Sequence, residues 1–175
     1  MKLKFKPFID RYWILLILIL IKFILQYVIV NPVYELHRDE FLYLDQADHL
    51  AFGYISVPPL TALISKLINL LDGSIFWIKS FPVLFGALTI IFTWLIVESV
   101  GGSFFSKILA SCALVFSPLM RINMLYQPNS FDILTWTIIF FLLIKFIQSE
   151  KTKWLWFLSA IVSVGFYNKY NLIFI

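Results

Sequence analysis

The chain has 175 residues, of which 61% are hydrophobic and 19% aromatic, and its mean hydropathy is +0.90. This composition excludes an ordinary soluble domain and indicates an integral membrane protein. The net charge of +4 is explained by basic residues that flank the apolar segments, so it does not require a nucleic-acid partner. The apolar runs are continuous rather than alternating, which favours spanning helices.

Five apolar segments predict the helices of a transmembrane bundle. In chain order they are residues 12–30, 80–97, 104–125 and 131–147, and a fifth that begins at Trp154 and is still under way at Ile175. The predicted fold class is therefore all-α, a polytopic transmembrane helix bundle. Because the apolar sequence runs on to the last residue, we expect residues 1–175 to be one transmembrane domain that is truncated at its C-terminus.

The basic residues predict the orientation of the bundle. With the N-terminus in the cytoplasm, more lysine and arginine residues fall in inner segments than in outer ones. The inner ones are Lys2, Lys4, Lys6, Arg11, Lys107, Lys145, Lys151 and Lys153. We therefore expect a multi-pass protein of the inner (plasma) membrane, with a cytoplasmic N-terminus and with residues 31–79 as an outer loop.

The outer loop is too long for a tight connection and too apolar for a solvated one. Two amphipathic helices lying in the membrane interface are therefore expected. The first runs from Glu40 to Gly53 and the second from Leu60 to Leu71. The apolar face of the second helix is made by Leu60, Leu63, Ile64, Leu67, Ile68 and Leu71.

The ionisable residues are concentrated in this outer loop. Five of the ten acidic residues lie between positions 35 and 48, and both histidines lie within or beside that stretch. Asp39 and Glu40 are adjacent, and adjacent helical residues point about 100° apart, so the two carboxylates are not expected to act on one substrate atom. A partly desolvated Asp39 could take a proton from an acceptor hydroxyl. The alternative is that Asp39 is a helix N-cap and that Glu40 adds charge in the first turn.

Three stretches of the chain, residues 38–63, 121–136 and 165–170, carry a resemblance to a known family. The first contains the Arg38-Asp39-Glu40 sequence, the second the Tyr-Gln-Pro-Asn sequence and the third Gly-Phe-Tyr-Asn-Lys-Tyr. They resemble bacterial membrane glycosyltransferases related to protein O-mannosyltransferases and to the aminoarabinose transferase of lipid A. The likeness extends, with gaps, across nearly the whole chain.

The resemblance implies a bundle of many transmembrane helices, called the GT-C fold, with its active site on the outer face. It also implies a sugar donor carried on a polyprenyl phosphate, inversion at the anomeric carbon, Asp39 as the base and Glu40 as a residue that shapes the site. Tyr43 matches a tyrosine near the pocket of the aminoarabinose transferase, whereas Leu42 and Val57 stand where that enzyme has arginine and lysine. The acceptor, which could be a lipid, a glycan or a protein, is therefore not carried over as lipid A.

Three downstream residues are further candidates for substrate binding. Arg121 and Lys169 are expected near the same outer face and could neutralise a departing phosphate, although ordinary snorkelling explains either residue alone. Asp132 stands at the start of the predicted fourth span, where it could cap the helix or contact the sugar.

No residue is assigned as a metal ligand, and a divalent metal stays an open alternative as a cofactor. Asp45, Asp48 and His49 have the i, i+3, i+4 spacing of a metal-binding set. A solvated polar helix face gives the same pattern.

Two other classes of protein fit part of the sequence. A secondary transporter would place ionisable groups near the midplane of several spans, whereas Lys22 alone is clearly central here. Because a central lysine costs about 2.5–3.5 kcal/mol on insertion, Lys22 is expected to face the protein interior. A noncatalytic membrane assembly subunit would use the acidic loop only as a helix cap and a solvated face. The gathering of the ionisable residues on one surface favours catalysis over both.

Overall fold

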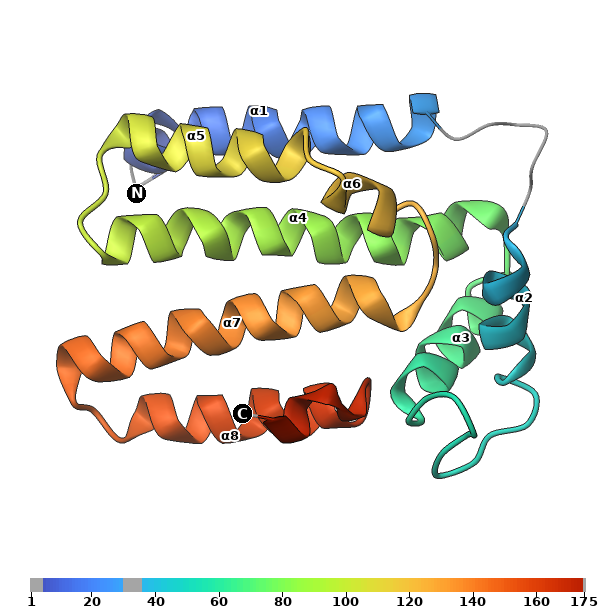
Figure 1. Cartoon of the computed structure of the whole chain (residues 1–175). Helices are drawn as coiled ribbons and strands as arrows, with labels where there is room; N and C mark the ends of the chain where they lie inside the picture. The colour runs from blue at the N-terminus through green and yellow to red at the C-terminus, as the bar shows by residue number, and fades with distance from the viewer. Residues whose placement is uncertain (1–4, 30–35, 175) are drawn as a thin grey trace.

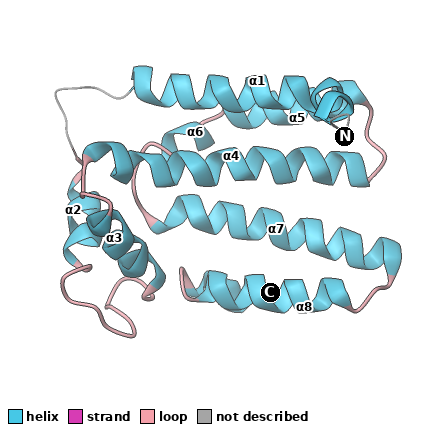
Figure 2. Ribbon diagram, turned by 180° about the vertical axis from the view of Figure 1, so that it is seen from behind, coloured by secondary structure: helices cyan, strands magenta, loops and turns pink. Residues whose placement is uncertain are grey.

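The computed structural model describes residues 5–29 and 36–174, and in these two stretches it is helical, without a β-strand. Long helices lie side by side, and two short ones pack across one end of the bundle (Figure 1, and from behind in Figure 2). The helices are α1 (Phe5–Ile29), α2 (Arg38–Asp45), α3 (Leu60–Leu70), α4 (Ile75–Ser99), α5 (Phe104–Val115), α6 (Leu119–Ile122), α7 (Pro128–Ser149) and α8 (Lys153–Phe166), followed by the 3-10 helix η1 (Tyr170–Phe174). The prediction of an all-α bundle is confirmed.

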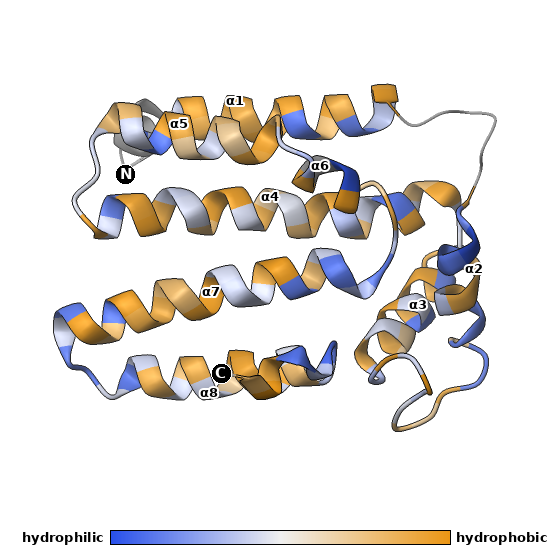
Figure 3. Ribbon diagram, in the orientation of Figure 1, coloured by the Kyte–Doolittle hydropathy of each residue, from blue (hydrophilic) through white to orange (hydrophobic). Residues whose placement is uncertain are grey.

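Three helices of the described residues are long and apolar enough to cross a membrane, namely α1 over Arg11–Ile29, α4 and α7. They contain the spans predicted at 80–97 and 131–147 and nearly all of the one at 12–30. Large apolar side chains on α1, such as Leu20 and Ile24, are more than half exposed, as expected for a surface that faces lipid. Figure 3 shows that hydrophobic residues run along these helices, and that hydrophilic residues gather on α2 and at the chain turns.

The span predicted at 104–125 is not one continuous helix, because α5, which begins at Phe104, ends at Val115 and the short α6 follows after a turn. Pro118 has no N–H group and disfavours the helical conformation at Ser117, so the chain turns there before the short α6. The Ser117 hydroxyl stabilises this turn by accepting the Leu119 N–H at 3.2 Å. The fifth predicted span is also corrected, since α8 ends at Phe166 after 14 residues and is too short to cross a ~30 Å core alone.

The two helices of the predicted outer loop have different outcomes. The first is shorter than expected, because α2 ends at Asp45 and turns follow it, not a helix running on to Gly53. The second is confirmed as α3. The polar residues Thr61 and Ser65 of α3 are buried against the protein, while Leu63 and Leu67 are about half exposed. This distribution suits a helix that turns part of its apolar face, at Leu63 and Leu67, to lipid, while Ile68 of the same face is buried in the protein.

The opposite end of the bundle is held by apolar packing and by ion pairs. Leu15 and Leu18 of α1 pack with Ile90 and Trp94 of α4 and with Val115 of α5 in one buried cluster. Beyond this cluster, Arg11 pairs with Glu98, and the Nζ atom of Lys107 lies 3.4 Å from the same carboxylate. These contacts hold the end of the bundle that lies opposite α2 and α3. The candidate site residues lie at the α2–α3 end.

Replacing Gly165 with alanine should loosen the packing of α8 against α7. A Cβ atom at Gly165 would overlap with the Thr135 Cγ2 atom and the Leu172 Cδ1 atom. Overpacking of this kind costs about 1–3 kcal/mol, which outweighs a helix-propensity gain of up to about 1 kcal/mol. Thermal unfolding in detergent should show a lower Tm for Gly165→Ala. The matched control is Gly53→Ala, whose Cβ would meet only the Tyr170 hydroxyl at 3.4 Å; equal melting of the two variants would contradict the prediction.

Candidate active site

The start of α2 is fixed by a capping box. His37 is the N-cap residue, and its Nδ1 atom accepts the Asp39 N–H at 3.3 Å. The Glu40 carboxylate accepts the His37 N–H at 2.8 Å, which satisfies another free donor of the first turn. The alternative that Asp39 is the N-cap is therefore wrong.

Glu40 is fully buried and is held by donors from three elements. The Lys79 ammonium of α4 donates to its two carboxylate oxygens at 2.6 and 2.7 Å, and the Tyr126 N–H, from the α6–α7 connection, donates to Oε1 at 2.7 Å. With the His37 N–H, these bonds occupy the carboxylate. Glu40 therefore positions α2 against α4 and the α6–α7 connection, and it is not placed to accept a proton from a substrate.

Tyr126 extends this network to α3. Its side chain is 3% exposed, and its hydroxyl donates to the Thr61 carbonyl at 2.8 Å and lies 2.8 Å from the Ser65 hydroxyl. Ser65 in turn donates to the Tyr43 carbonyl at 2.7 Å. Burial raises the pKa of the Tyr126 phenol, so it remains a neutral hydrogen-bonding group. The result is one polar network through α2, α3, α4 and the α6–α7 connection.

Asp39 lies outside this network. Its side chain is 39% exposed, and its cationic neighbours are the adjacent Arg38, 3.4 Å away through Nε, and His37, 3.8 Å away through Nδ1. Tyr43 follows one helical turn later and is half-buried. Burial and then the charge of Asp39 raise the pKa of the Tyr43 phenol, so Tyr43 stays protonated beside the carboxylate. Asp39 thus keeps an accessible carboxylate that no buried cation of the described residues neutralises.

Asp132 and Lys169 meet where the turn after α8 packs on the first turns of α7. The Asn171 side-chain amide donates to Asp132 Oδ2 at 2.9 Å, and the Lys169 ammonium lies 3.7 Å from the same oxygen. Lys169 also donates to the Asn129 side-chain oxygen at 2.9 Å. Asp132 Oδ1 is buried and accepts no hydrogen bond from the described residues. The N-cap of α7 is Gln127, so the alternative that Asp132 caps this helix is wrong.

Arg121 lies in the short helix α6, and its exposed side chain makes no ion pair within the described stretches. It borders a hollow of about 420 Å³ whose other lining residues are mostly apolar, namely Pro118, Leu119, Ile122, Leu125 and Gln127. A cation at the edge of an apolar hollow is suited to an amphipathic anion.

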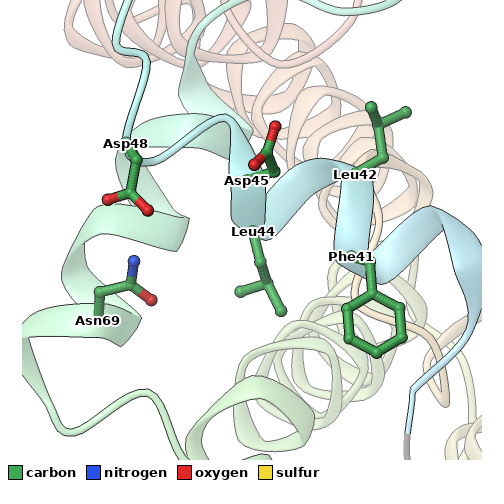
Figure 4. Close-up of a pocket in the computed structure, with 6 residues that line it drawn as sticks. All are labelled: Phe41, Leu42, Leu44, Asp45, Asp48 and Asn69. Carbon is green, nitrogen blue, oxygen red and sulfur yellow. The ribbon is translucent and has the colours of Figure 1, made fainter.

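A second hollow, of about 560 Å³, lies beside α2 and is lined by Phe41, Leu42, Leu44, Asp45, Asp48 and Asn69. Figure 4 shows Asp48 and Asn69 facing one another across it. Asp39 is not among these lining residues.

Within residues 5–29 and 36–174 no group of three or more His, Cys, Asp or Glu side chains is placed to hold a metal. Asp45, Asp48 and His49 do not share one helix face as their i, i+3, i+4 spacing predicts, because α2 ends at Asp45. The Asp48 carboxylate instead lies 3.7 Å from the Lys66 ammonium.

The candidate residues lie at one end of the bundle, where Figure 1 places α2, α6, the start of α7 and η1. Asp132 and Lys169 form an ion pair and Tyr43 lies beside Asp39 on α2, but no hydrogen bond or ion pair in the described stretches joins Asp39 to Arg121. Sequence reasoning missed Lys79, Tyr126 and Asn171. The sequence offered one indication of this network, the position of Lys79 just before a predicted span, where a basic residue without an assigned partner needs an acidic one.

The family described as dolichyl-phosphate-mannose-protein mannosyltransferase matches residues 56–175. The chain belongs to this family of GT-C membrane glycosyltransferases, which makes it a membrane-integral enzyme of the mannosyltransferase type. The matched residues include Lys79, Arg121, Asp132 and Lys169, whereas α2 precedes them. No curated protein and no solved structure matches the chain.

Replacing Glu40 with glutamine should destabilise the protein, because it leaves the buried Lys79 ammonium without its counter-ion. Breaking a buried pair in this way costs about 3–5 kcal/mol. We expect a clear fall in Tm for Glu40→Gln, and a smaller fall when Lys79→Met is added to it. Glu150→Gln, which changes an exposed glutamate at the end of α7, is the control. A Glu40→Gln variant that melts with the wild type would show that the pair does not support the fold.

Proposed function

We propose that the protein transfers a sugar from a polyprenyl-phosphate donor to a hydroxyl acceptor on the outer face of the membrane, with Asp39 as the base. Family membership supports glycosyl transfer in general. The observation that carries the role of Asp39 is the difference between the carboxylates at the α2–α3 end. Glu40 is occupied by four hydrogen bonds, and Asp132 is mostly buried with its Oδ2 atom beside an amide and an ammonium, while Asp39 is accessible.

The proposed reaction is a direct displacement at the anomeric carbon. Asp39 takes the proton from the acceptor hydroxyl, and the acceptor oxygen forms a bond to the anomeric carbon. The bond between that carbon and the phosphate oxygen breaks, and the phosphate leaves with the electron pair. The products are the glycosylated acceptor and a polyprenyl phosphate, and the attack inverts the anomeric centre.

Arg121 is the proposed partner of the donor phosphate. A guanidinium can bind two phosphate oxygens at once and stabilises the charge that grows on the leaving group. The apolar hollow beside Arg121 suits the first isoprene units of the donor, which prefer an environment without water. Arg121 is thus suited to the phosphate of the donor, and the hollow beside it to the adjoining part of the lipid.

Asp132 and Lys169 are proposed to bind the sugar. The buried Asp132 Oδ1 is available to accept a hydrogen bond from a sugar hydroxyl. Lys169 is partly neutralised by Asp132 and is held by Asn129, so we assign it to orientation of the sugar together with a smaller share of phosphate binding. Tyr43, kept protonated next to Asp39, is proposed to donate a hydrogen bond near the acceptor.

The proposed topology places the α2–α3 end outside the plasma membrane and the N-terminus in the cytoplasm. Arg11 and Lys107 lie together at the opposite end through Glu98, where the positive-inside rule expects basic residues. In this orientation residues 31–79 are the outer loop of a single transmembrane domain, and α3 lies along the membrane surface with Leu63 and Leu67 toward lipid.

Replacing Asp39 with asparagine should remove most of the transfer activity. Loss of a general base lowers rates by about 10²–10⁴-fold. The measurement is the release of polyprenyl phosphate from a radiolabelled polyprenyl-phosphate mannose by membranes that contain equal amounts of each variant. Asp48→Asn, in the same loop and more exposed than Asp39, is the matched control. Undiminished transfer by Asp39→Asn would remove Asp39 from the base role.

Replacing Arg121 with glutamine should weaken binding of the donor. A hydrogen bond to a charged group contributes about 1.5–3 kcal/mol, which corresponds to a rise in KM for the donor of about 10–100-fold. Arg121→Lys should keep part of the affinity, because it retains the charge but not the two-pronged geometry. An unchanged KM in Arg121→Gln, measured in the same release assay, would assign the phosphate to another cation.

A further inference from the structure

Lys22 is a buried ammonium in the first span that the proposed function does not use. Its side chain is 2% exposed, which confirms the prediction that it faces the interior. Its Nζ atom has no hydrogen-bond acceptor among the described residues. Glu40 pairs with Lys79 and Glu98 with Arg11, and no described carboxylate accepts a hydrogen bond from Lys22. An ammonium at this depth needs an acceptor, because leaving it unpaired in an apolar interior is costly.

Lys22 lines a small enclosed cavity between α1, α4, α5, α6 and α7. The other lining residues are Gly86, Thr89, Ile90, Leu114, Leu119, Asn123 and Ile133. The cavity has a volume of about 10 Å³, which is close to the volume that one water molecule requires by the same measure. Gly86 lets the Lys22 and Asn123 side chains pack close to α4, since a Cβ atom there would overlap with the Lys22 Cε atom and the Asn123 side-chain amide.

The polar groups around the cavity complement a water molecule. The Thr89 hydroxyl donates its proton to the Phe85 carbonyl at 2.8 Å, so its oxygen is left with lone pairs to accept another hydrogen bond. The Lys22 ammonium offers donors only, and the Asn123 side-chain amide borders the same space. A molecule that accepts from Lys22 and donates to Thr89 would use both groups, and buried waters usually make about three such bonds.

We propose that this cavity binds one water molecule, which accepts a hydrogen bond from Lys22 and donates one to Thr89. An anion such as phosphate or a carboxylate is too large for about 10 Å³. The bound water joins α1 to α4 in the middle of the bundle, next to the α6 segment.

The water site lies beside a second contact between α1 and the segment that follows α6. Gln26, one helical turn after Lys22 and fully buried, donates through Nε2 to the Asn123 carbonyl. Asn123 borders the cavity with its side chain and accepts from Gln26 with its backbone. The water site therefore supports the position of α6, whose last turn carries Arg121, and this role is independent of whether sugar transfer is the reaction.

The proposal is tested first by a structure of the full chain in detergent at a resolution that shows ordered water. Density for one water-sized atom within hydrogen-bond distance of Lys22 Nζ and Thr89 Oγ1 supports it. A resolved cavity without such density, or density for a larger group bonded to Lys22, overturns it.

A double-mutant cycle tests the same bridge without a structure. Lys22→Met and Thr89→Val each remove one partner of the water, so the double variant should lose less stability than the sum of the single variants. We expect a deviation from additivity of about 2–4 °C in Tm. Additive shifts would overturn the proposal.

Thr137 supplies the matched control for this cycle. Its hydroxyl donates to the Ile133 carbonyl at 2.8 Å, as that of Thr89 does to Phe85, but Thr137 does not line the cavity. Thr137→Val should therefore combine additively with Lys22→Met. Equal coupling of Lys22 to both threonines would point to a general loosening of the bundle and would also overturn the proposal.

Discussion

The buried pair of Glu40 and Lys79 determines the architecture of the α2–α3 end. Burying either charge without a partner would be costly, because the desolvation of an isolated carboxylate or ammonium outweighs the contacts that its side chain gains. Each therefore requires the other, and the short α2 must lie where α4 presents Lys79. Since the same carboxylate also accepts the Tyr126 N–H, the path of the α6–α7 connection is set by the same group.

This constraint separates two neighbouring carboxylates into different roles. Glu40 points into the protein and is neutralised by Lys79, while Asp39, about 100° away around the helix, remains accessible. The capping box explains why this separation is robust, since His37 fixes the first turn from outside and Glu40 fixes it from inside. A pair of acidic residues that looks equivalent in the sequence thus becomes one structural group and one group available for chemistry.

The sequence predicted the features that depend on local pattern. Apolar runs located α1, α4 and α7, and the periodicity of Leu60–Leu71 located α3, because a continuous or one-sided apolar pattern leaves few alternatives in a membrane. It failed where tertiary or local backbone effects decide. Pro118 interrupts the run at 104–125, and α2 stops at Asp45 although the wheel pattern continues. The partnership of Glu40 with Lys79 joins residues 39 positions apart, and no local pattern indicates which lysine meets which glutamate.

The α6–α7 connection is held through its main chain as well as through the buried Tyr126 side chain. Gln26 binds the Asn123 carbonyl, Lys79 binds the Met124 carbonyl at 3.3 Å, and Glu40 binds the Tyr126 N–H. These anchors recognise peptide groups, which every residue type supplies apart from the N–H that proline lacks. The side chains at positions 124 and 125 can therefore drift during evolution while the course of the connection is retained. Divergent relatives would then share the same backbone course here despite low sequence identity, provided that they retain the side chains equivalent to Gln26, Lys79 and Glu40.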